Sequence, residues 1–133
     1  MSSPTKTVQL ESTLTYDSLR KHDKAQVLGS LLKKYRNEHN TNIIEEATDN
    51  VDDMVYVPSQ FKLWTGRFVR YLDASNPLCL KFSKGGFVVK DNTYTVLLKT
   101  DNGLYRVGKR SRFFFMSLAN VDRTRLYLEK LSS

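Results

Sequence analysis

The sequence is poor in the residues that form covalent cross-links and in long apolar runs. Cys79 is the single cysteine among 133 residues, so an internal disulfide is excluded and the chain suits a reducing compartment. No apolar run approaches the roughly 18 to 20 residues needed to span a bilayer, and the N-terminus lacks the apolar segment of a secretory signal. We therefore expect an intracellular protein, nuclear or cytoplasmic, without a membrane span.

The sequence also lacks arrangements that would support catalysis. The two histidines, His22 and His39, do not match the ligand spacing of a zinc site, and neither can be assigned to Cys79 as a base. The stretch 103–109 has the spacing of a phosphate-binding loop, but Arg110 stands where that loop needs Ser or Thr. Four aspartates of the second part fall at turns or at a helix start, where aspartate serves local hydrogen bonding and not acid/base chemistry: Asp73, Asp91, Asp101 and Asp122. We therefore expect no enzyme activity, no cofactor, no metal site and no small-molecule substrate.

The net positive charge is confined to the second part of the chain. The formal net charge is +7, from 21 Lys and Arg against 14 Asp and Glu. Residues 1–55 hold seven Lys and Arg against nine Asp and Glu, whereas residues 56–133 hold fourteen against five. The basic character of the second part is typical of proteins with a polyanionic or acidic partner.

The first part is expected to hold a tail, one amphipathic helix and a linker. Residues 1–14 are rich in Ser and Thr and carry no period, which indicates a flexible tail. Residues 15–44 form the helical segment, in which Asn37 or Asn40 is expected to end the helix. Residues 45–53 hold five carboxylates in nine positions, which predicts a solvated acidic linker. The helix carries an apolar stripe that packs on the chain's own sheet or docks on a partner protein: Leu28, Leu31, Leu32 and Tyr35.

Residues 54–133 are expected to form a basic barrel domain of short strands closed by a C-terminal helix. In LCLKF (78–82) the side chains of Leu78, Leu80 and Phe82 face one way, as in a strand with one exposed face. Asn102-Gly103 suits a type I′ hairpin turn, and 120–131 has helical spacing. Strands are expected near 54–57, 61–72, 78–82, 87–90, 93–100, 104–108 and 112–117.

The predicted fold class is α+β and mainly β. An N-terminal amphipathic helix precedes a small antiparallel barrel or sandwich of six to seven strands. This order of elements resembles the pleckstrin-homology-type sandwich, whose terminal helix plugs an open corner. An oligonucleotide-binding barrel is the alternative, although that barrel usually places a helix between its third and fourth strands and residues 83–93 leave no room for one.

Cationic and aromatic side chains are interleaved along the predicted strands, and this pattern is the one that suggests a function. Single-stranded nucleic acids are commonly held in this way, because cations neutralise phosphates and rings offer faces for base stacking. Acidic proteins and anionic lipid headgroups are alternatives. The pattern also includes Lys90, Tyr71 and Phe87. The residues expected to contact nucleic acid are Arg67, Arg70, Lys81, Lys84, Lys99, Arg106, Lys109, Arg110, Arg112, Tyr94 and Tyr105.

The stretch GKRSRFFFM (108–116) joins cations to three phenylalanines. Alternate side chains of a strand point to opposite faces, so the three rings cannot all be displayed on one face. We expect Phe113 and Phe115 to be core residues, and Phe114 as well if both faces are covered. Lys109, Arg110 and Arg112 are expected to stay in water at the bend.

The sequence thus favours a non-enzymatic subunit of an intracellular, nuclear nucleoprotein complex. Its basic barrel would contact the backbone of DNA or RNA, and other protein subunits would be its partners in a hetero-oligomer. The alternative is an adaptor that docks on proteins through its helices and its sheet, without contact to nucleic acid.

Overall fold

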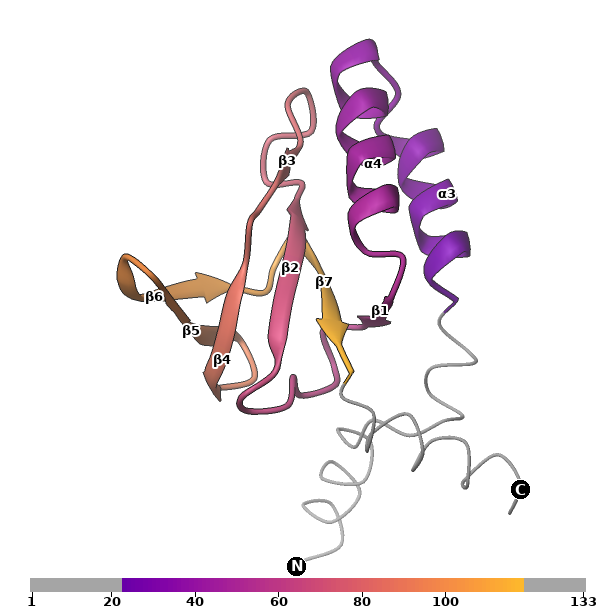
Figure 1. Ribbon diagram of the computed structural model, residues 1–133. Coiled ribbons are helices and arrows are strands. Elements are labelled where there is room, and N and C mark those ends of the chain that lie inside the picture. The colour runs from indigo at the N-terminus through magenta and orange to yellow at the C-terminus, as the bar shows by residue number, and fades with distance from the viewer. Residues whose placement is uncertain (1–22, 119–133) are drawn as a thin grey trace, which may run out of the picture.

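Two helices precede seven strands in this computed structural model, which describes residues 23–118 (Figure 1). The helices are α3 (Lys24–Lys34) and α4 (Glu38–Asn50). Most of the regular structure is antiparallel sheet, which confirms the mainly β, α+β class. The predicted tail 1–14, the start of the helical segment and the C-terminal helix lie outside the described residues. The strands are β1 (Met54–Val57), β2 (Phe68–Asp73), β3 (Lys81–Phe82), β4 (Gly86–Asp91), β5 (Thr95–Thr100), β6 (Gly103–Gly108) and β7 (Arg112–Ser117).

The predicted helical segment, 15–44, is interrupted between Lys34 and Glu38, so the prediction of a single helix there is wrong. The side chain of Asp23 caps α3 by accepting a hydrogen bond from Ala25 N at 2.9 Å. Asn37 does not end a helix but begins α4, because its Oδ1 accepts a bond from Asn40 N at 2.7 Å. The chain therefore turns between the two helices, and α4 runs beside α3 (Figure 1).

The predicted acidic linker, 45–53, is largely helix. Residues 45–50 complete α4, and the next strand begins at Met54. Ile44, Ala47 and Val51 recur at helical spacing and are fully buried, whereas Glu45 and Glu46 are exposed. The carboxylates thus lie on the solvent-exposed side of an amphipathic helix, and the buried apolar stripe on its other side stabilises the helix.

The strands form one antiparallel sheet with the order β1-β7-β2-β4-β5-β6. The last strand, β7, lies between β1 and β2, and Arg70 opposite Phe115 marks its register on β2. The short β3 pairs with the end of β2, on the same side as β4. The predicted strand 78–82 is thus reduced to Lys81–Phe82, since Leu78 is 79% exposed while Leu80 is buried. The two ends of the sheet, β1 and β6, are not paired with each other, so closure into a barrel is not observed.

The turn between β5 and β6 also differs from the predicted one. Thr100 pairs with Gly103, so the two central residues are Asp101 and Asn102 rather than the expected Asn102-Gly103 pair. Neither central residue has a positive φ, which a type I′ turn requires at both positions. Gly103 instead begins β6 with φ of +112°.

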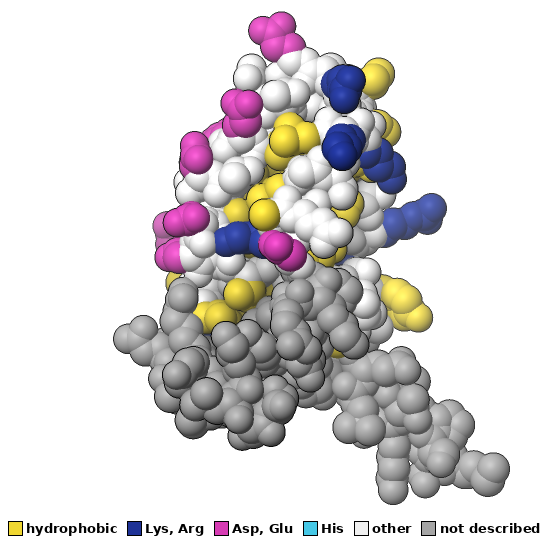
Figure 2. Space-filling view, turned by 90° about the vertical axis from the view of Figure 1, so that its right-hand side faces the viewer, with side chains coloured by type: hydrophobic (Ala, Val, Ile, Leu, Met, Phe, Trp, Pro, Cys, Tyr) yellow, Lys and Arg dark blue, Asp and Glu magenta, His cyan; other side chains and the backbone are white. Residues whose placement is uncertain are grey.

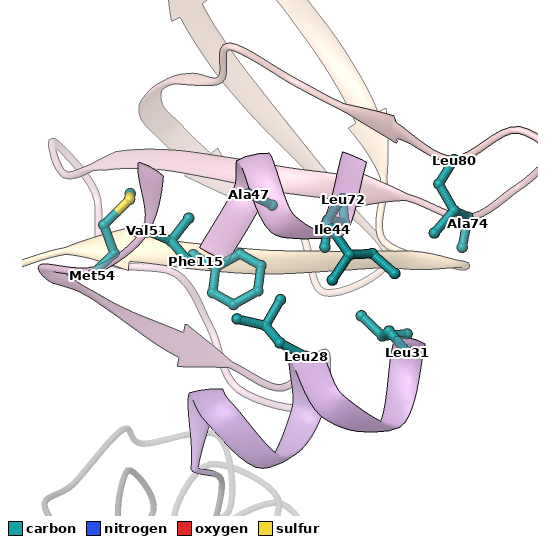
Figure 3. Packing of buried hydrophobic residues seen from close by; sticks show 10 residues of the cluster. All are labelled: Leu28, Leu31, Ile44, Ala47, Val51, Met54, Leu72, Ala74, Leu80 and Phe115. Carbon is teal, nitrogen blue, oxygen red and sulfur yellow. The ribbon is translucent and has the colours of Figure 1, made fainter. Parts of the chain in front are cut away.

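The sheet is covered on both faces where the helices lie. Leu28 and Leu31 of α3 point toward Phe115 and Ile44, in the cluster that joins the helices to the sheet (Figure 3). The opposite face of β7 contributes Phe114 and Met116 to a second cluster, enclosed by the curled sheet. The three consecutive phenylalanines are therefore structural: Phe114 and Phe115 are buried, and Phe113 is half-buried against the helical cluster.

The helices leave part of the sheet uncovered. They pack against the side made by β1, β7 and β2, whereas β4, β5 and β6 extend away from them (Figure 1). Among residues 23–118, neither α3 nor α4 has the length and the run of apolar residues that a membrane-spanning helix requires.

Candidate functional site

The helical layer and the sheet carry opposite charge balances. Residues 23–53 hold seven Asp and Glu against four Lys and Arg, whereas residues 54–118 hold eleven Lys and Arg against three aspartates. On the helical side, most acidic side chains lie along one margin and most basic ones along the other (Figure 2). The charge asymmetry of the sequence is therefore an asymmetry between two layers of the fold.

Lys109, expected to be available to a polyanion, is buried. Its side chain is 5% exposed, and its Nζ lies 2.6 Å from Oδ2 of Asp91 and 3.3 Å from the carbonyl oxygen of Phe61. The prediction that Lys109 stays in water is wrong, because the inward-facing Asp91 at the end of β4 holds the ammonium inside the fold.

Two of the predicted arginines also hold the structure together. Arg70 donates from Nε to the carbonyl of Ser83 at 3.1 Å and from Nη1 to Oδ1 of Asn50 at 3.2 Å. Its guanidinium lies 4.1 Å from the ring centre of Phe82, a cation–π contact. Arg70 thus connects the end of α4 to the segment between β3 and β4, and little of it is available to a ligand.

Arg112 begins β7 and is anchored in a similar way. Its Nη1 donates to the carbonyl of Gly108 at 3.1 Å, and its Nε lies 3.3 Å from Oδ2 of Asp73. Its side chain is about a quarter exposed, so Arg112 is not among the cations that a polyanion would reach first.

The uncovered side of β4, β5 and β6 brings together several of the remaining cations. The strand registers place Phe68, Phe87, Lys99 and Leu104 in one row across four neighbouring strands. A second row runs through Lys90, Leu97 and Arg106. We call the members of these two rows on β4, β5 and β6 the outer face: Phe87, Lys90, Leu97, Lys99, Leu104 and Arg106.

No carboxylate lies on the outer face. The single acid within these three strands is Asp91, which is buried and paired with Lys109. Lys90 and Lys99 are exposed and form no ion pair with any residue of 23–118. Because neither ammonium is held in an ion pair by a residue of 23–118, both remain available to an anion.

A groove of about 960 Å³ opens beside the first row, between the segment 83–86 and the hairpin 100–102. Lys84 and Lys99 supply cations to its lining, and Phe68 and Phe87 supply rings. These two rings contact edge to face, with centroids 5.4 Å apart, and 53% of Phe87 remains exposed. Asp101, at the hairpin, is the one acidic residue of the lining. The groove therefore offers an aromatic surface and two lysines in one lining.

Tyr105 also lines the groove, but from the inward side of β6. Burial and the neighbouring Tyr71 raise the pKa of the Tyr105 phenol, against the lowering effect of a hydrogen bond with Ser83. The phenol therefore stays neutral at physiological pH and adds no negative charge to the groove. Tyr105 is half-buried, so Phe87 is the better exposed ring, and the sequence pattern contained Phe87 without singling it out.

Two predicted residues lie at the turns that lead out of β4 and β6. Tyr94, 83% exposed, is in the β4–β5 turn, and Arg110 is exposed in the β6–β7 turn. The amide of Lys109 donates to the carbonyl of Tyr94 at 2.9 Å, which brings the two turns together. Neither residue lines the groove.

The last two predicted cations lie beside β2. Lys81 is exposed on β3 opposite Asp73, and Arg67 is half-buried just before β2. Like Tyr94 and Arg110, they are absent from the groove lining. Of the eleven predicted contacts, the groove and the outer face thus collect four: Lys84, Lys99, Arg106 and Tyr105.

The residues predicted to dock on a partner are occupied within the chain. Leu28 and Leu31 are each 4% exposed, and Leu32 and Tyr35 pack partly buried against the same cluster. A partner protein could not reach this stripe without displacing α3. The alternative, packing on the chain's own sheet, is the arrangement found.

The fold brings His39 next to Cys79, a contact that the sequence did not reveal. The Cys79 Sγ lies 3.5 Å from the Nε2 of His39, which also lies 3.0 Å from the carbonyl oxygen of Leu80. A carbonyl accepts hydrogen bonds and cannot donate, so Nε2 carries a proton in that bond. This nitrogen then has no lone pair with which to activate the thiol. Within residues 23–118 no three His, Cys, Asp or Glu side chains are grouped as metal ligands.

The outer face and the groove are therefore the arrangement from which a function must be argued. Comparison of the chain with protein-family models, with curated proteins and with solved structures gives no match.

Proposed function

We propose that the groove and the outer face bind single-stranded DNA or RNA. The observation that carries this proposal is the exposed ring of Phe87 in a groove that Lys84 and Lys99 also line, neither of which forms an ion pair with any residue of 23–118. The phosphates next to a base stacked on Phe87 would meet these ammonium groups. Such binding depends little on sequence, because every base has a face that can stack.

The register of the strands supports this pairing of ring and charge. Phe87 and Lys99 are directly opposite each other on β4 and β5, and such neighbours have Cβ atoms about 5 Å apart. Phe68 fixes the ring of Phe87 from the other side. Lys90 and Arg106, in the next row, would then contact phosphates further along the strand.

The wider role follows from the same proposal. The chain would act as a non-enzymatic, nuclear subunit of a nucleoprotein complex, with other proteins as partners and with no cofactor. The order of elements would be that of a pleckstrin-homology-type sandwich, whose predicted closing helix lies outside the described residues. An adaptor that docks through the stripe of α3 is less well supported, because Leu28 and Leu31 are buried.

Binding to fluorescent oligothymidylate and oligouridylate at several salt concentrations tests the proposal. We expect the logarithm of the binding constant to fall linearly with the logarithm of the salt concentration, by about 0.7 for each phosphate neutralised on a single strand. Replacing Lys84 and Lys99 together by Glu should reduce that slope and weaken binding. Lys33→Glu with Lys34→Glu makes the same change of charge on the exposed side of α3 and should have little effect. No binding at low salt would overturn the proposal.

The aromatic contact has its own test. Phe87→Ala should weaken binding by about 1–3 kcal/mol, the usual contribution of one stacked base, and should leave the salt dependence unchanged. Leu104→Ala removes an exposed apolar side chain from the same row and serves as the matched control. Equal losses from the two variants would mean that apolar area, and not the ring, is recognised.

A further inference from the structure

The strand β6 forms one end of the sheet and is paired on one side only. It spans six residues, Gly103–Gly108, and each of them is in register with a residue of β5. No strand within residues 23–118 pairs with its other side. The strand contains no proline and its register shows no bulge, and these are two of the devices that commonly protect such an edge.

The main-chain groups in the middle of β6 point away from the sheet. In a hairpin with a two-residue turn the closing pair, here Thr100 and Gly103, exchanges main-chain hydrogen bonds. From that pair onward, hydrogen-bonded and non-hydrogen-bonded pairs alternate along the two strands. Leu104 and Arg106 therefore direct their N–H and C=O groups outward. Further along the strand, the carbonyl of Gly108 already accepts a bond from Arg112. The open stretch of edge is thus centred on Leu104 and Arg106.

The side chains beside this open stretch indicate what would fit there. Leu104 is 62% exposed, and the side chain of Arg106 is also exposed on the outer face. Lys99 lies directly opposite Leu104 on β5, and no carboxylate lies on this face. A strand added to β6 would therefore meet an apolar surface and at least two positive charges.

A second copy of the chain fits this edge poorly. Pairing two β6 strands would bring Arg106 and Lys99 of one copy close to the same cations of the other, and like charges on neighbouring strands repel. A nucleic acid would not satisfy the edge either, since it has no main chain with alternating donors and acceptors at the spacing of a strand. An extended protein segment with carboxylates satisfies both the main-chain groups and the charge.

We propose that β6 accepts an extended acidic segment of a partner protein as an additional strand. The segment places an apolar side chain against Leu104 and a carboxylate against Arg106, which are two residues apart and share a face. The main-chain bonds supply the affinity and the two side chains supply the preference, as in other cases of strand addition. The proposal does not depend on nucleic-acid binding, although Lys99, Leu104 and Arg106 belong both to this edge and to the outer face.

Hydrogen exchange measured by NMR on the full chain tests the proposal, with an end-capped peptide of alternating glutamate and valine as the probe. We expect the peptide to slow exchange of the amide protons of Leu104 and Arg106. A peptide of alternating lysine and valine should not have this effect. Failure of the glutamate peptide to protect these two amides at millimolar concentration overturns the proposal.

A charge exchange between protein and peptide makes the test specific. Arg106→Glu should weaken binding of the glutamate peptide by about five- to ten-fold and strengthen binding of the lysine peptide, whereas Lys33→Glu should change neither. Unchanged affinities in Arg106→Glu would overturn the proposal. So would protection of both amides in the protein alone as its concentration rises, which would assign the edge to a second copy. Protection by oligothymidylate instead of the peptide would assign it to the nucleic-acid site.

Discussion

The ammonium of Lys109 lies 2.6 Å from the carboxylate of Asp91, and both side chains are nearly excluded from water. Asp91 also accepts hydrogen bonds from the main-chain amides of Leu63 and Thr93, each at 2.8 Å. Lys109 donates in addition to the carbonyl of Phe61. One ion pair thus holds the β4–β5 turn, the β6–β7 turn and the segment before β2 in fixed positions.

Removing one member of this pair leaves the other charge buried without compensation. We expect Lys109→Met to lower the free energy of unfolding by about 3–5 kcal/mol, the usual range for a broken buried pair. Urea denaturation followed by circular dichroism measures it. Arg110→Met, at the exposed neighbouring position, is the control and should change stability by less than about 0.5 kcal/mol.

The double variant Asp91→Asn with Lys109→Met separates the charge effect from the loss of packing. The amides of Leu63 and Thr93 donate to different oxygens of Asp91, so the side-chain amide introduced by Asp91→Asn can accept from only one of them. The double variant leaves no charge buried without a partner, and it should therefore be less destabilised than the sum of the two single variants. Strict additivity would show that the two charges do not stabilise each other.

Gly85 lies where β3 and β4 run past β2, and no side chain fits there. Its φ is +79°, and a Cβ atom would lie 1.8 Å from the carbonyl oxygen of Val69. Gly85→Ala must therefore displace one strand from the other, and we expect a loss of about 2 kcal/mol or more. Because Gly85 lines the groove, this variant should also weaken binding there.

Gly29→Ala is the matched control for that change. Beyond the backbone of α3 itself, no atom lies within 4 Å of the added Cβ, and alanine is favoured over glycine in a helix by up to about 1 kcal/mol. We expect a small rise in melting temperature for Gly29→Ala and a large fall for Gly85→Ala. An equal fall in melting temperature for both variants would contradict the argument that the steric contact at Gly85 causes the loss of stability.

The sequence predicted those elements whose apolar spacing was undisturbed. The stripe of Leu28 and Leu31 correctly indicated an amphipathic helix, and the alternation in 112–117 correctly gave a strand. The spacing could not tell which surface covers the stripe, because an amphipathic helix packs equally well on its own sheet and on another protein.

The acidic stretch 45–53 was misjudged because local composition concealed its packing. Ile44, Ala47 and Val51 are few among the carboxylates, yet all three are fully buried. A helix needs one apolar side to be stabilised by a core, and the charge of its other side matters little.

The sequence predicted the types of residue at the candidate site, but not which of the cations are exposed and lie together. Lys84, Lys99 and Arg106 were singled out by charge alone, and they are exposed in the structure. Lys109 belonged to the same pattern but is buried, because Asp91 stands eighteen residues earlier and only the fold brings the two together. The contact between His39 and Cys79 was hidden for the same reason.

Asn40 connects α4 to the segment that precedes β3. It is fully buried, its Oδ1 accepts a bond from Leu80 N at 2.9 Å, and its Nδ2 donates to the carbonyl of Pro77 at 2.8 Å. Asn40→Ala leaves both main-chain groups without partners, so we expect a loss of about 1–3 kcal/mol and faster hydrogen exchange at Leu80. Asn42→Ala, exposed on the same helix, should be neutral or slightly stabilising. Similar losses in the two variants would refute a specific role for Asn40.

The Asp73 carboxylate should make stability depend on pH on the acid side. Its Oδ1 accepts a bond from Ser75 N at 2.9 Å and its Oδ2 lies 3.3 Å from Nε of Arg112. Burial alone would raise the pKa of Asp73, but the bonds from Ser75 and the charge of Arg112 outweigh it and hold the pKa below its usual value. The unfolded chain therefore binds the proton more readily, so the stabilisation is complete above the unfolded pKa, about 4. This stabilisation is lost as the pH falls through the folded pKa.

Asp73→Asn should lower the free energy of unfolding at neutral pH, and it should make that free energy fall less steeply as the pH is lowered. Asp101→Asn removes the same charge from an exposed turn and controls for net charge. An unchanged acid slope in Asp73→Asn would contradict the argument.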